Sequence, residues 1–279
     1  MLDAFKKMAY GARVFLARSG QTSLVDVAGR PTQVRHGGSG PPLVYLHSAI
    51  GETVWLPFLE RWARHFAVYA PAHPGYAKSE GIEQIDTMDD MVFHYAELFD
   101  ALGLDQVNLG GVSLGGWIAA EFAVRWPERV RRLWLCGAPG LWLPEKPLMD
   151  LFRHSQDVQA ARHALFYDPH SAPATLIIKD PEKLNDETKL AAYKSMSVLA
   201  RLTWERPYSP KLASRLHRIK CPTLILSGDT DRLIPPEYAR EYQRLIPGST
   251  LHLFAKCGHL PMFEKESEFV KTVADFCQG

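Results

Sequence analysis

The chain has 279 residues, of which 46% are hydrophobic and 23% are charged, and its formal net charge is +1. This composition suffices for one large hydrophobic core, and the balanced charge argues against a nucleic-acid partner, which usually requires a basic stripe. The four cysteines form no CxxC pair, so we expect reduced thiols, no disulfide framework and a cytoplasmic location. No apolar run reaches the roughly 20 residues that a membrane-spanning helix needs.

The N-terminal segment is basic and partly amphipathic. Arg13 and Arg18 interrupt what would have to be the apolar core of a signal peptide. We predict that residues 1–22 form an extension that precedes the folded core. Two interpretations stay open: a helix on the domain surface or in an oligomer contact, or a peripheral membrane contact through residues 1–20. The sequence carries no other signal for an oligomeric state.

The next segments alternate in a regular way. Residues 23–36 alternate apolar and polar side chains around a short turn, which predicts a hairpin of two half-buried strands. Continuous apolar runs, typical of strands buried on both faces of a sheet, then alternate with helical stretches. The runs lie at 42–47, 67–71, 107–111 and from 131 onward, and the helical stretches at about 53–65, 87–102 and 114–126. This order predicts an α/β fold with a doubly wound, mostly parallel sheet.

The alternation is interrupted between residues 140 and 210. This stretch is rich in Pro, His, Trp and Tyr and contains no buried strand run. The pattern then resumes, with strands at 222–228 and 249–254 and helices at about 236–246 and 264–277. We therefore predict a core formed by residues 23–139 and 211–279, with a helical insertion at 140–210 before the last strands.

The run GGVSLGG places Ser113 in a G-x-S-x-G pattern between Gly111 and Gly115. A buried strand leads directly into the pattern and a helix follows directly, which is the context that exposes a serine on a tight, strained turn. The N-terminus of that helix also favours negative charge beside the serine. We predict that Ser113 is a catalytic nucleophile; the alternative is a capping serine in a glycine-rich turn.

A nucleophilic serine needs a base, and the base needs a carboxylate that orients it. His259 lies in a glycine-containing loop after the last predicted strand, from which its imidazole can reach the carboxyl edge of the sheet. For the acid, SGDTDRLIPP offers Asp229 and Asp231 after a preceding strand. We favour Asp231, which lies further out in the loop, since Asp229 is also suited to bonding the backbone of the turn.

The runs GVSLGG, SGDTDRLIPP and CGHLPMFE resemble the nucleophile elbow, acid loop and histidine loop of the α/β-hydrolase superfamily. LVYLHSAIGETVW and APAHPGYAKSE resemble its two earlier loops, and the similarity covers about residues 23–135 and 215–279 in the right order. The resemblance implies that the insertion forms a helical cap over the nucleophile. We expect Trp142 and Trp204 of this cap, together with Ser48, to line an apolar substrate pocket.

The resemblance also implies two backbone amides that stabilise an oxyanion. One is the amide of Leu114, directly after the nucleophile, and the other is the amide of Ala49. The superfamily usually has His-Gly before the second donor, whereas this chain has His47-Ser48, and a Cβ at Ser48 constrains the backbone. His-Ser at this place resembles the enol-lactone hydrolases of the superfamily.

These residues predict a serine hydrolase that cleaves carboxylic esters through an acyl-enzyme on Ser113. The expected partner is a small-molecule ester or lactone with an apolar group. An alternative is cleavage of an enol-lactone or a carbon–carbon bond by the same triad, although the chain lacks the Gly-Pro-Gly-type loop typical of meta-cleavage hydrolases. A third interpretation is a ligand receptor with the hydrolase fold. We expect no cofactor and no metal, because HGGSG lacks the Lys-Ser/Thr of a phosphate loop and no histidine pair stands at ligand spacing.

Overall fold

The computed structural model describes residues 20–150, 152 and 157–279. The first two strands, β1 (Gln21–Val27) and β2 (Arg30–Gly37), pair antiparallel as the predicted hairpin. Strand β1 begins two residues earlier than expected, so residues 21 and 22 belong to the sheet and not to the predicted extension. Residues 1–19, on which the predicted surface or membrane contact falls, lie outside the described residues.

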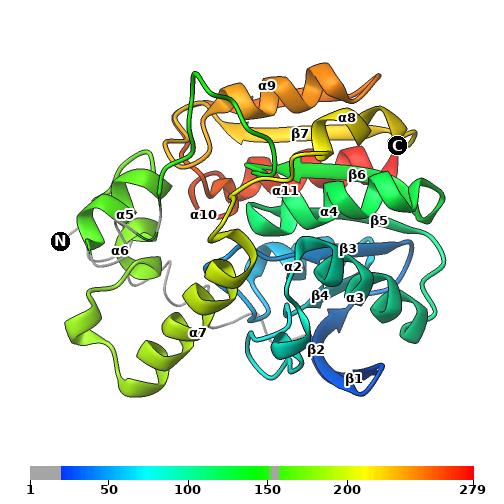
Figure 1. Cartoon of the computed structure of the whole chain (residues 1–279), viewed down its shortest axis with the longest axis horizontal. Coiled ribbons are helices and arrows are strands. Elements are labelled where there is room, and N and C mark those ends of the chain that lie inside the picture. The colour runs from blue at the N-terminus through cyan, green and yellow to red at the C-terminus, as the bar shows by residue number, and fades with distance from the viewer. Residues whose placement is uncertain (1–19, 151, 153–156) are drawn as a thin grey trace.

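One eight-stranded sheet runs through the molecule in the order β1-β2-β4-β3-β5-β6-β7-β8 (Figure 1). Its other strands are β3 (Pro42–Leu46), β4 (Ala67–Pro71), β5 (Val107–Val112), β6 (Val130–Cys136), β7 (Thr223–Gly228) and β8 (Thr250–Phe254). Neighbouring strands from β4 to β8 are parallel, and β2 pairs antiparallel with both β1 and β4. The prediction of a mostly parallel sheet is confirmed.

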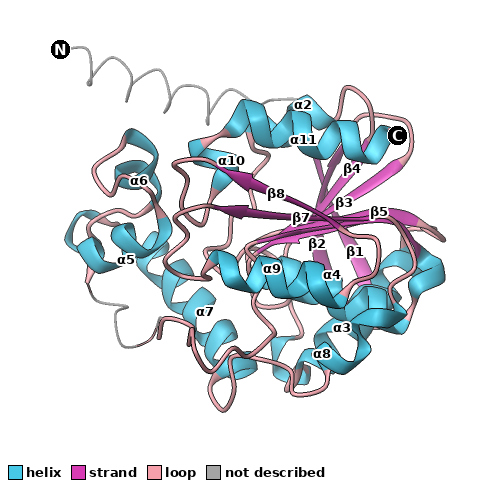
Figure 2. Cartoon of the chain, turned by 90° about the horizontal axis from the view of Figure 1, so that it is seen from above, coloured by secondary structure: helices cyan, strands magenta, loops and turns pink. Residues whose placement is uncertain are grey.

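Helices cover both faces of this sheet (Figure 2). On one face lie α2 (Pro57–Trp62) and α11 (Glu266–Gln278), and on the other lie α3 (Met88–Ala101), α4 (Leu114–Arg125) and α9 (Pro236–Leu245). Shorter helices are α8 (Leu212–Arg215) and α10 (Pro261–Glu264), with single 3₁₀ turns at Ile82–Gln84, Pro127–Arg129, Pro181–Lys183 and Leu216–Arg218. The fold is therefore doubly wound, as expected from the alternation of strands and helices.

Local chemistry explains where two of these helices begin. Helix α2 is shorter than the predicted stretch at 53–65, because Pro57 holds Leu56 in an extended conformation and the helix starts only at the proline. Helix α3 begins after Thr87, whose side chain accepts a hydrogen bond from the Asp90 amide while the Asp90 carboxylate accepts one from the Thr87 amide. This reciprocal cap satisfies amides that the first helical turn leaves free.

The insertion, residues 140–210, is helical in its described part and contains α5 (Val158–Leu165), α6 (Ala172–Ile177) and α7 (Asp186–Thr203). These helices lie beyond the carboxyl ends of β7 and β8 (Figure 2). The two ends of the insertion meet, since Gly140 pairs with Tyr208 and the Ser209 amide donates to the Gly140 carbonyl at 2.9 Å. The insertion therefore leaves and rejoins the core at one place.

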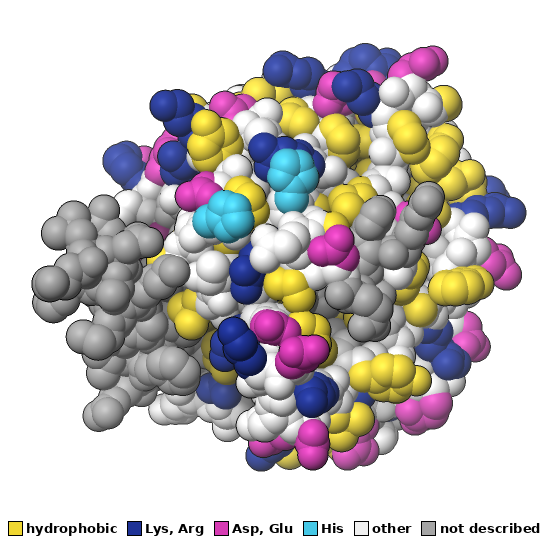
Figure 3. Space-filling model, turned by 90° about the vertical axis from the view of Figure 1, so that its left-hand side faces the viewer, with side chains coloured by type: hydrophobic (Ala, Val, Ile, Leu, Met, Phe, Trp, Pro, Cys, Tyr) yellow, Lys and Arg dark blue, Asp and Glu magenta, His cyan; other side chains and the backbone are white. Residues whose placement is uncertain are grey.

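Figure 3 faces this end of the molecule, where hydrophobic side chains lie scattered among charged ones. Among residues 20–150, 152 and 157–279, no helix combines the length and the apolar character that crossing a bilayer would require.

Candidate active site

The turn between β5 and α4 holds Ser113 in a strained conformation. Its φ of 55° and ψ of −120° lie in a region that side-chain-bearing residues rarely occupy. An ideal Cβ on Gly115 would lie 2.0 Å from the Leu46 carbonyl oxygen, and one on Gly111 would lie 2.6 Å from the same oxygen. The Ser113 amide donates to the Cys136 carbonyl at 2.8 Å. The two glycines thus let the turn lie against β3, while β6 holds it from the other side.

The structure brings Asp231 and His259 together from two loops that follow β7 and β8. The Asp231 Oδ2 and His259 Nδ1 atoms lie 2.7 Å apart, and both side chains are buried. The other carboxylate oxygen, Oδ1, accepts the amides of Leu233 at 3.0 Å and Ile234 at 2.8 Å. Since a carboxylate accepts hydrogen bonds, the Nδ1 proton of the imidazole points at Oδ2, and Nε2 is the ring nitrogen that the acid leaves free. Within the described residues this Nε2 has no hydrogen-bond partner.

Asp229, the other acid that the sequence offered, lies elsewhere. Its side chain is exposed, and its carboxylate accepts the Thr230 hydroxyl at 2.8 Å and the Cys257 amide at 3.3 Å. Of the two aspartates, Asp231 is therefore the one that contacts His259. Asp229 ties the acid loop to the start of the histidine loop.

Gly137 is a site residue that our sequence reasoning missed. An ideal Cβ at this position would lie 2.9 Å from His259 Cε1 and 3.3 Å from Asp231 Oδ2. The residue also has a φ of 52°, which favours glycine. Its place directly after a buried strand, in CGAPG, was the available signal. A larger residue here would push the imidazole away from its place.

The histidine loop and the acid loop both contact the end of α5 in the insertion. The His259 amide donates to the Leu165 carbonyl at 2.8 Å. Glu264 accepts the Gly258 amide at 2.6 Å and, through its other oxygen, the Tyr167 amide at 2.8 Å. Arg232, next to the acid, donates to the carbonyls of His163 and Phe166 at 3.0 Å each. The contacts with residues 163–167 join segments far apart in the sequence, so no local pattern indicates them.

The loop after β3 contains the second expected oxyanion donor, Ala49. The amides of Ala49 and Leu114 form no hydrogen bond with another described residue, as two oxyanion donors would require. Ser48 has an ordinary negative φ, and the positive φ of this loop falls on Gly51 instead. The missing glycine therefore causes no backbone strain.

That the Ser48 side chain lines the substrate pocket stays a prediction, and the structure shows what this side chain binds within the protein. Ser48 is buried, and its hydroxyl donates to Glu52 Oε2 at 2.7 Å while accepting the Ile50 amide at 3.2 Å. A carboxylate four residues further along the chain gives the buried hydroxyl an acceptor inside the loop. Ser48 thus shapes the loop from within.

Two buried histidines brace the same loop. The His73 amide donates to His47 Nε2 at 2.9 Å, and His73 Nε2 in turn donates to the His47 carbonyl at 2.9 Å. His47 Nδ1 donates to the Ser48 carbonyl at 2.7 Å. Burial lowers the pKa of both imidazoles, so both are neutral at pH 7. His47 therefore acts as a structural part of the loop.

The two predicted pocket tryptophans lie on the insertion with much of their surface exposed. Trp142 stacks on Tyr208 at a ring distance of 5.2 Å, beside the point where the insertion leaves the core. Trp204 is 74% exposed and packs against Phe152 at 5.6 Å. That either ring contacts a substrate stays a prediction.

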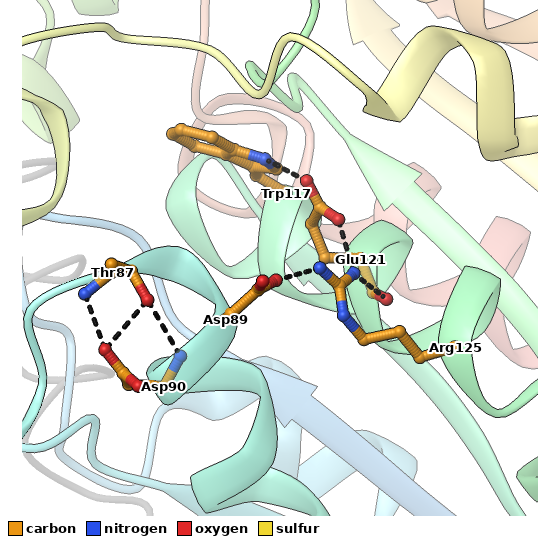
Figure 4. A network of polar contacts seen from close by, with 6 residues as sticks. All are labelled: Thr87, Asp89, Asp90, Trp117, Glu121 and Arg125. Carbon is orange, nitrogen blue, oxygen red and sulfur yellow. Dashed lines mark hydrogen bonds and ion pairs between the residues drawn. The ribbon is translucent and has the colours of Figure 1, made fainter.

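A polar network runs along α4 away from the nucleophile (Figure 4). The Trp117 indole donates to Glu121 at 3.2 Å, and Arg125 donates to the same buried carboxylate at 2.5 Å. Arg125 also pairs with Asp89 of α3. An ideal Cβ on Gly140 would lie 2.4 Å from the Trp117 ring, so the start of the insertion rests on this indole. Across the described ranges, no three His, Cys, Asp or Glu side chains come together as a metal site would require.

Comparisons with known proteins bear on the family and the fold of this chain. The sequence profile of the Alpha/beta hydrolase family matches residues 36–272. The chain is 33% identical over 278 residues to 2-hydroxy-6-oxo-2,4-heptadienoate hydrolase of Pseudomonas putida, with 95% of each chain covered. It is 28% identical to 2-hydroxymuconate semialdehyde hydrolase of a Pseudomonas species, with 90% of this chain and 92% of that one covered. Its fold is similar to the crystal structure of a membrane phospholipase A, with a TM-score of 0.80, 24% identity, and 100% of this chain and 92% of that one covered.

Proposed function

Because the chain belongs to the alpha/beta hydrolase family, we propose that it is a serine hydrolase with Ser113 as nucleophile, His259 as base and Asp231 as the orienting acid. The hydrogen bond between Asp231 and His259 at 2.7 Å carries this proposal, because it leaves the Nε2 lone pair of a buried imidazole free to take a proton. The strained turn at Ser113 and the free amides of Ala49 and Leu114 support it.

For the substrate, we propose a 2-hydroxy-6-oxo-2,4-dienoate whose bond between C5 and C6 is cleaved. The relative that shares 33% identity over 95% of both chains is a hydrolase of such a compound. This assignment differs from the ester cleavage that the sequence alone favoured.

The triad can perform this reaction with balanced steps. The dienoate first shifts to its 2-oxo tautomer, in which the proton of the 2-hydroxyl has moved to C5 and the double bond joins C3 and C4. Electrons released at C5 can then delocalise through this double bond onto the C2 carbonyl. Ser113 Oγ then attacks the C6 carbonyl carbon while His259 Nε2 takes its proton, and the amides of Ala49 and Leu114 stabilise the oxyanion. The C5–C6 bond breaks, the dienoate fragment keeps the electron pair and receives the proton from His259. Water, deprotonated by His259, hydrolyses the acyl-enzyme.

Cleavage of a carboxylic ester is the second candidate. The loop of residues 47–52 is closed by Ser48 and Glu52 and lacks the Gly-Pro-Gly-type sequence typical of meta-cleavage hydrolases. The acyl-enzyme on Ser113 is the same in both reactions, and only the leaving group differs. An intact acid–histidine pair argues against a ligand receptor without turnover.

A substrate panel separates these functions. Purified protein is assayed with 2-hydroxy-6-oxo-2,4-heptadienoate, an enol-lactone and p-nitrophenyl esters of several chain lengths, with Ser113→Ala as the matched control. We expect the dienoate to give the highest kcat/KM and the variant to lose turnover of every substrate. Preference for the esters would refute the carbon–carbon assignment alone, whereas full activity of Ser113→Ala would refute the nucleophile.

A further inference from the structure

Glu52 collects three hydrogen bonds inside the loop that follows β3. Its Oε1 accepts the Tyr45 hydroxyl at 2.8 Å and the Ser48 amide at 2.8 Å, and its Oε2 accepts the Ser48 hydroxyl at 2.7 Å. Burial, followed by the nearby Glu52 carboxylate, raises the pKa of Tyr45 well above its usual value, so the phenol keeps the proton that it donates. One carboxylate therefore ties the end of the strand to the first turn of the loop.

These bonds use up the amides on either side of Ala49. The Ser48 amide is held by Glu52, the Ile50 amide donates to the Ser48 hydroxyl at 3.2 Å, and the Gly51 amide donates to the Ser48 carbonyl at 3.1 Å. The Ala49 amide has no partner among the described residues. The loop thus holds the amides of Ser48, Ile50 and Gly51, and the Ala49 amide between them is left for a bound atom.

The loop also lies against the nucleophile turn. An ideal Cβ on Gly115 would lie 2.0 Å from the Leu46 carbonyl oxygen and 2.7 Å from that of His47, so the first turn of α4 contacts the chain just before Ser48. Small changes in the loop therefore change where the Ala49 amide points relative to Ser113.

We propose that Glu52 is a positioning residue, which sets the direction of the Ala49 amide so that it can stabilise the oxyanion formed on the carbonyl that Ser113 attacks. The proposal rests on the proposed function. Glu52 acts through the loop and does not touch the substrate. In a chain with Ser48 where relatives of its fold usually have glycine, the bond from the Ser48 hydroxyl to Glu52 holds the backbone in the required shape.

Geometry, and not negative charge, is what this role requires. Gln at position 52 keeps a carbonyl oxygen for Tyr45 and the Ser48 amide, and its NH₂ group can donate to the Ser48 oxygen. Asp keeps the charge but is one methylene too short to hold the same three donors. If the role is geometric, the Gln variant keeps activity and the Asp variant loses it. If the role is electrostatic, the Asp variant keeps activity and the Gln variant loses it.

The experiment compares Glu52→Gln, Glu52→Asp and Glu52→Ala with the wild type, using the best substrate of the panel. Because a misdirected Ala49 amide weakens one oxyanion donor, we expect Glu52→Asp and Glu52→Ala to lower kcat about 10- to 100-fold with KM within about twofold. The Glu52→Gln variant should stay within about threefold of the wild-type kcat. Binding of a trifluoromethyl ketone, which forms a tetrahedral adduct on the serine, should weaken in parallel with kcat. Glu80→Ala, which removes an exposed acid, is the control and should leave both quantities unchanged.

The outcomes are distinct. Wild-type kcat in Glu52→Ala would overturn the proposal, as would a Gln variant that loses as much activity as the Asp variant. If Glu52→Ala fails to fold, the other two variants still test the proposal, which requires a higher kcat in Glu52→Gln than in Glu52→Asp. Full activity of Ser113→Ala would refute the proposed function itself, whereas an inactive Ser113→Ala beside a fully active Glu52→Asp would refute only the role of Glu52.

Discussion

At the scale of single residues, the candidate site depends on backbone positions that close contacts hold in place. Ser113 occupies a backbone conformation that costs a residue with a side chain about 1–3 kcal/mol. The contacts of Gly111 and Gly115 with the Leu46 carbonyl, and the bond from Ser113 to Cys136, keep it there. On the other side of the site, Gly137 leaves just enough room for the His259 ring. Single substitutions at these glycines therefore change the placement of Ser113 or His259 without removing a reacting group.

Replacing Asp231 by Asn should lower kcat about 10³- to 10⁴-fold. Oδ1 accepts two backbone amides, so the Asn carbonyl oxygen takes that place and its NH₂ group faces His259 Nδ1. The imidazole must then accept this hydrogen bond at Nδ1 and carry its own proton on Nε2. A protonated Nε2 cannot take the proton of Ser113. Asp229→Asn is the matched control and should keep kcat within about twofold. Equal loss in both variants, measured as kcat on the same substrate, would contradict the assignment of the acid.

Gly137→Ala should lower kcat about tenfold, because its Cβ would lie 2.9 Å from His259 Cε1 and displace the ring. The positive φ of Gly137 adds a stability cost of about 1 kcal/mol. Gly103→Ala is the matched control, since Gly103 has a φ of 66° and its Cβ would meet nothing within 4 Å. Urea unfolding should show a similar loss of unfolding free energy in both variants, while only Gly137→Ala lowers kcat. A lower kcat in both variants would indicate that backbone strain, and not the contact with His259, causes the loss.

The sequence predicted the residues that lie in local patterns and missed those that act through distant contacts. Ser113 stands in a short motif after a buried strand, His259 stands in a glycine-containing loop after the last strand, and the loop position of Asp231 was the reason to prefer it over Asp229. Gly137 and the contact of Glu264 with Tyr167 have no such pattern, because the partners lie more than 90 residues away. Glu52 is close to Ser48 in the chain, but its role depends on how the loop folds back.

At the scale of elements, α3 joins the edge of the sheet to α4. Asp89 of α3 pairs with Arg125 of α4, and His94 of α3 lies against Thr32 of β2 with 3.3 Å between Nε2 and the hydroxyl. His94 is buried and its Nδ1 has no described partner. Burial, with a smaller contribution from Arg30, lowers its pKa to about 4. The packing of α3 on β2 therefore requires a neutral imidazole.

Acid should weaken this contact in a defined pH range. The folded pKa of His94, about 4, lies below the value of about 6.5 in the unfolded chain, so the unfolded state binds more protons between these values. The stabilisation is complete above pH 6.5 and is lost as the pH falls toward 4, by about 1–2 kcal/mol at pH 5. His94→Gln should therefore lose less unfolding free energy than the wild type between pH 7 and pH 5. His217→Gln, which removes an exposed imidazole, is the control and should lose as much unfolding free energy between pH 7 and pH 5 as the wild type. An equal loss in His94→Gln would contradict the lowered pKa of His94.

At the scale of the whole molecule, the insertion is attached to the core at several places. The first is the pair of Gly140 and Tyr208, which packs on Trp117 of α4. The second is the end of α5, which the acid and histidine loops hold through Arg232 and Glu264. Helix α7 makes a further attachment, since Arg201 donates to the Ile85 carbonyl at 2.6 Å. Helices α5, α6 and α7 lie in the stretch that the sequence predicted as a helical insertion, but its attachment to the acid and histidine loops depends on pairings that no local pattern indicates. The insertion and the candidate triad should therefore respond together when the second attachment is broken.

Glu264→Ala tests this coupling, because its carboxylate joins the Gly258 amide of the histidine loop to the Tyr167 amide of the insertion. We expect a loss of about 2 kcal/mol in unfolding free energy, from two charge-assisted hydrogen bonds on a partly exposed group, and a kcat lowered about tenfold as His259 loses its fixed position. Hydrogen exchange should rise in both 163–167 and 257–259. Glu266→Ala is the control, since Glu266 pairs with Arg61 at the surface and should change neither segment. Faster exchange in only one of the two segments would show that the insertion and the histidine loop are held independently.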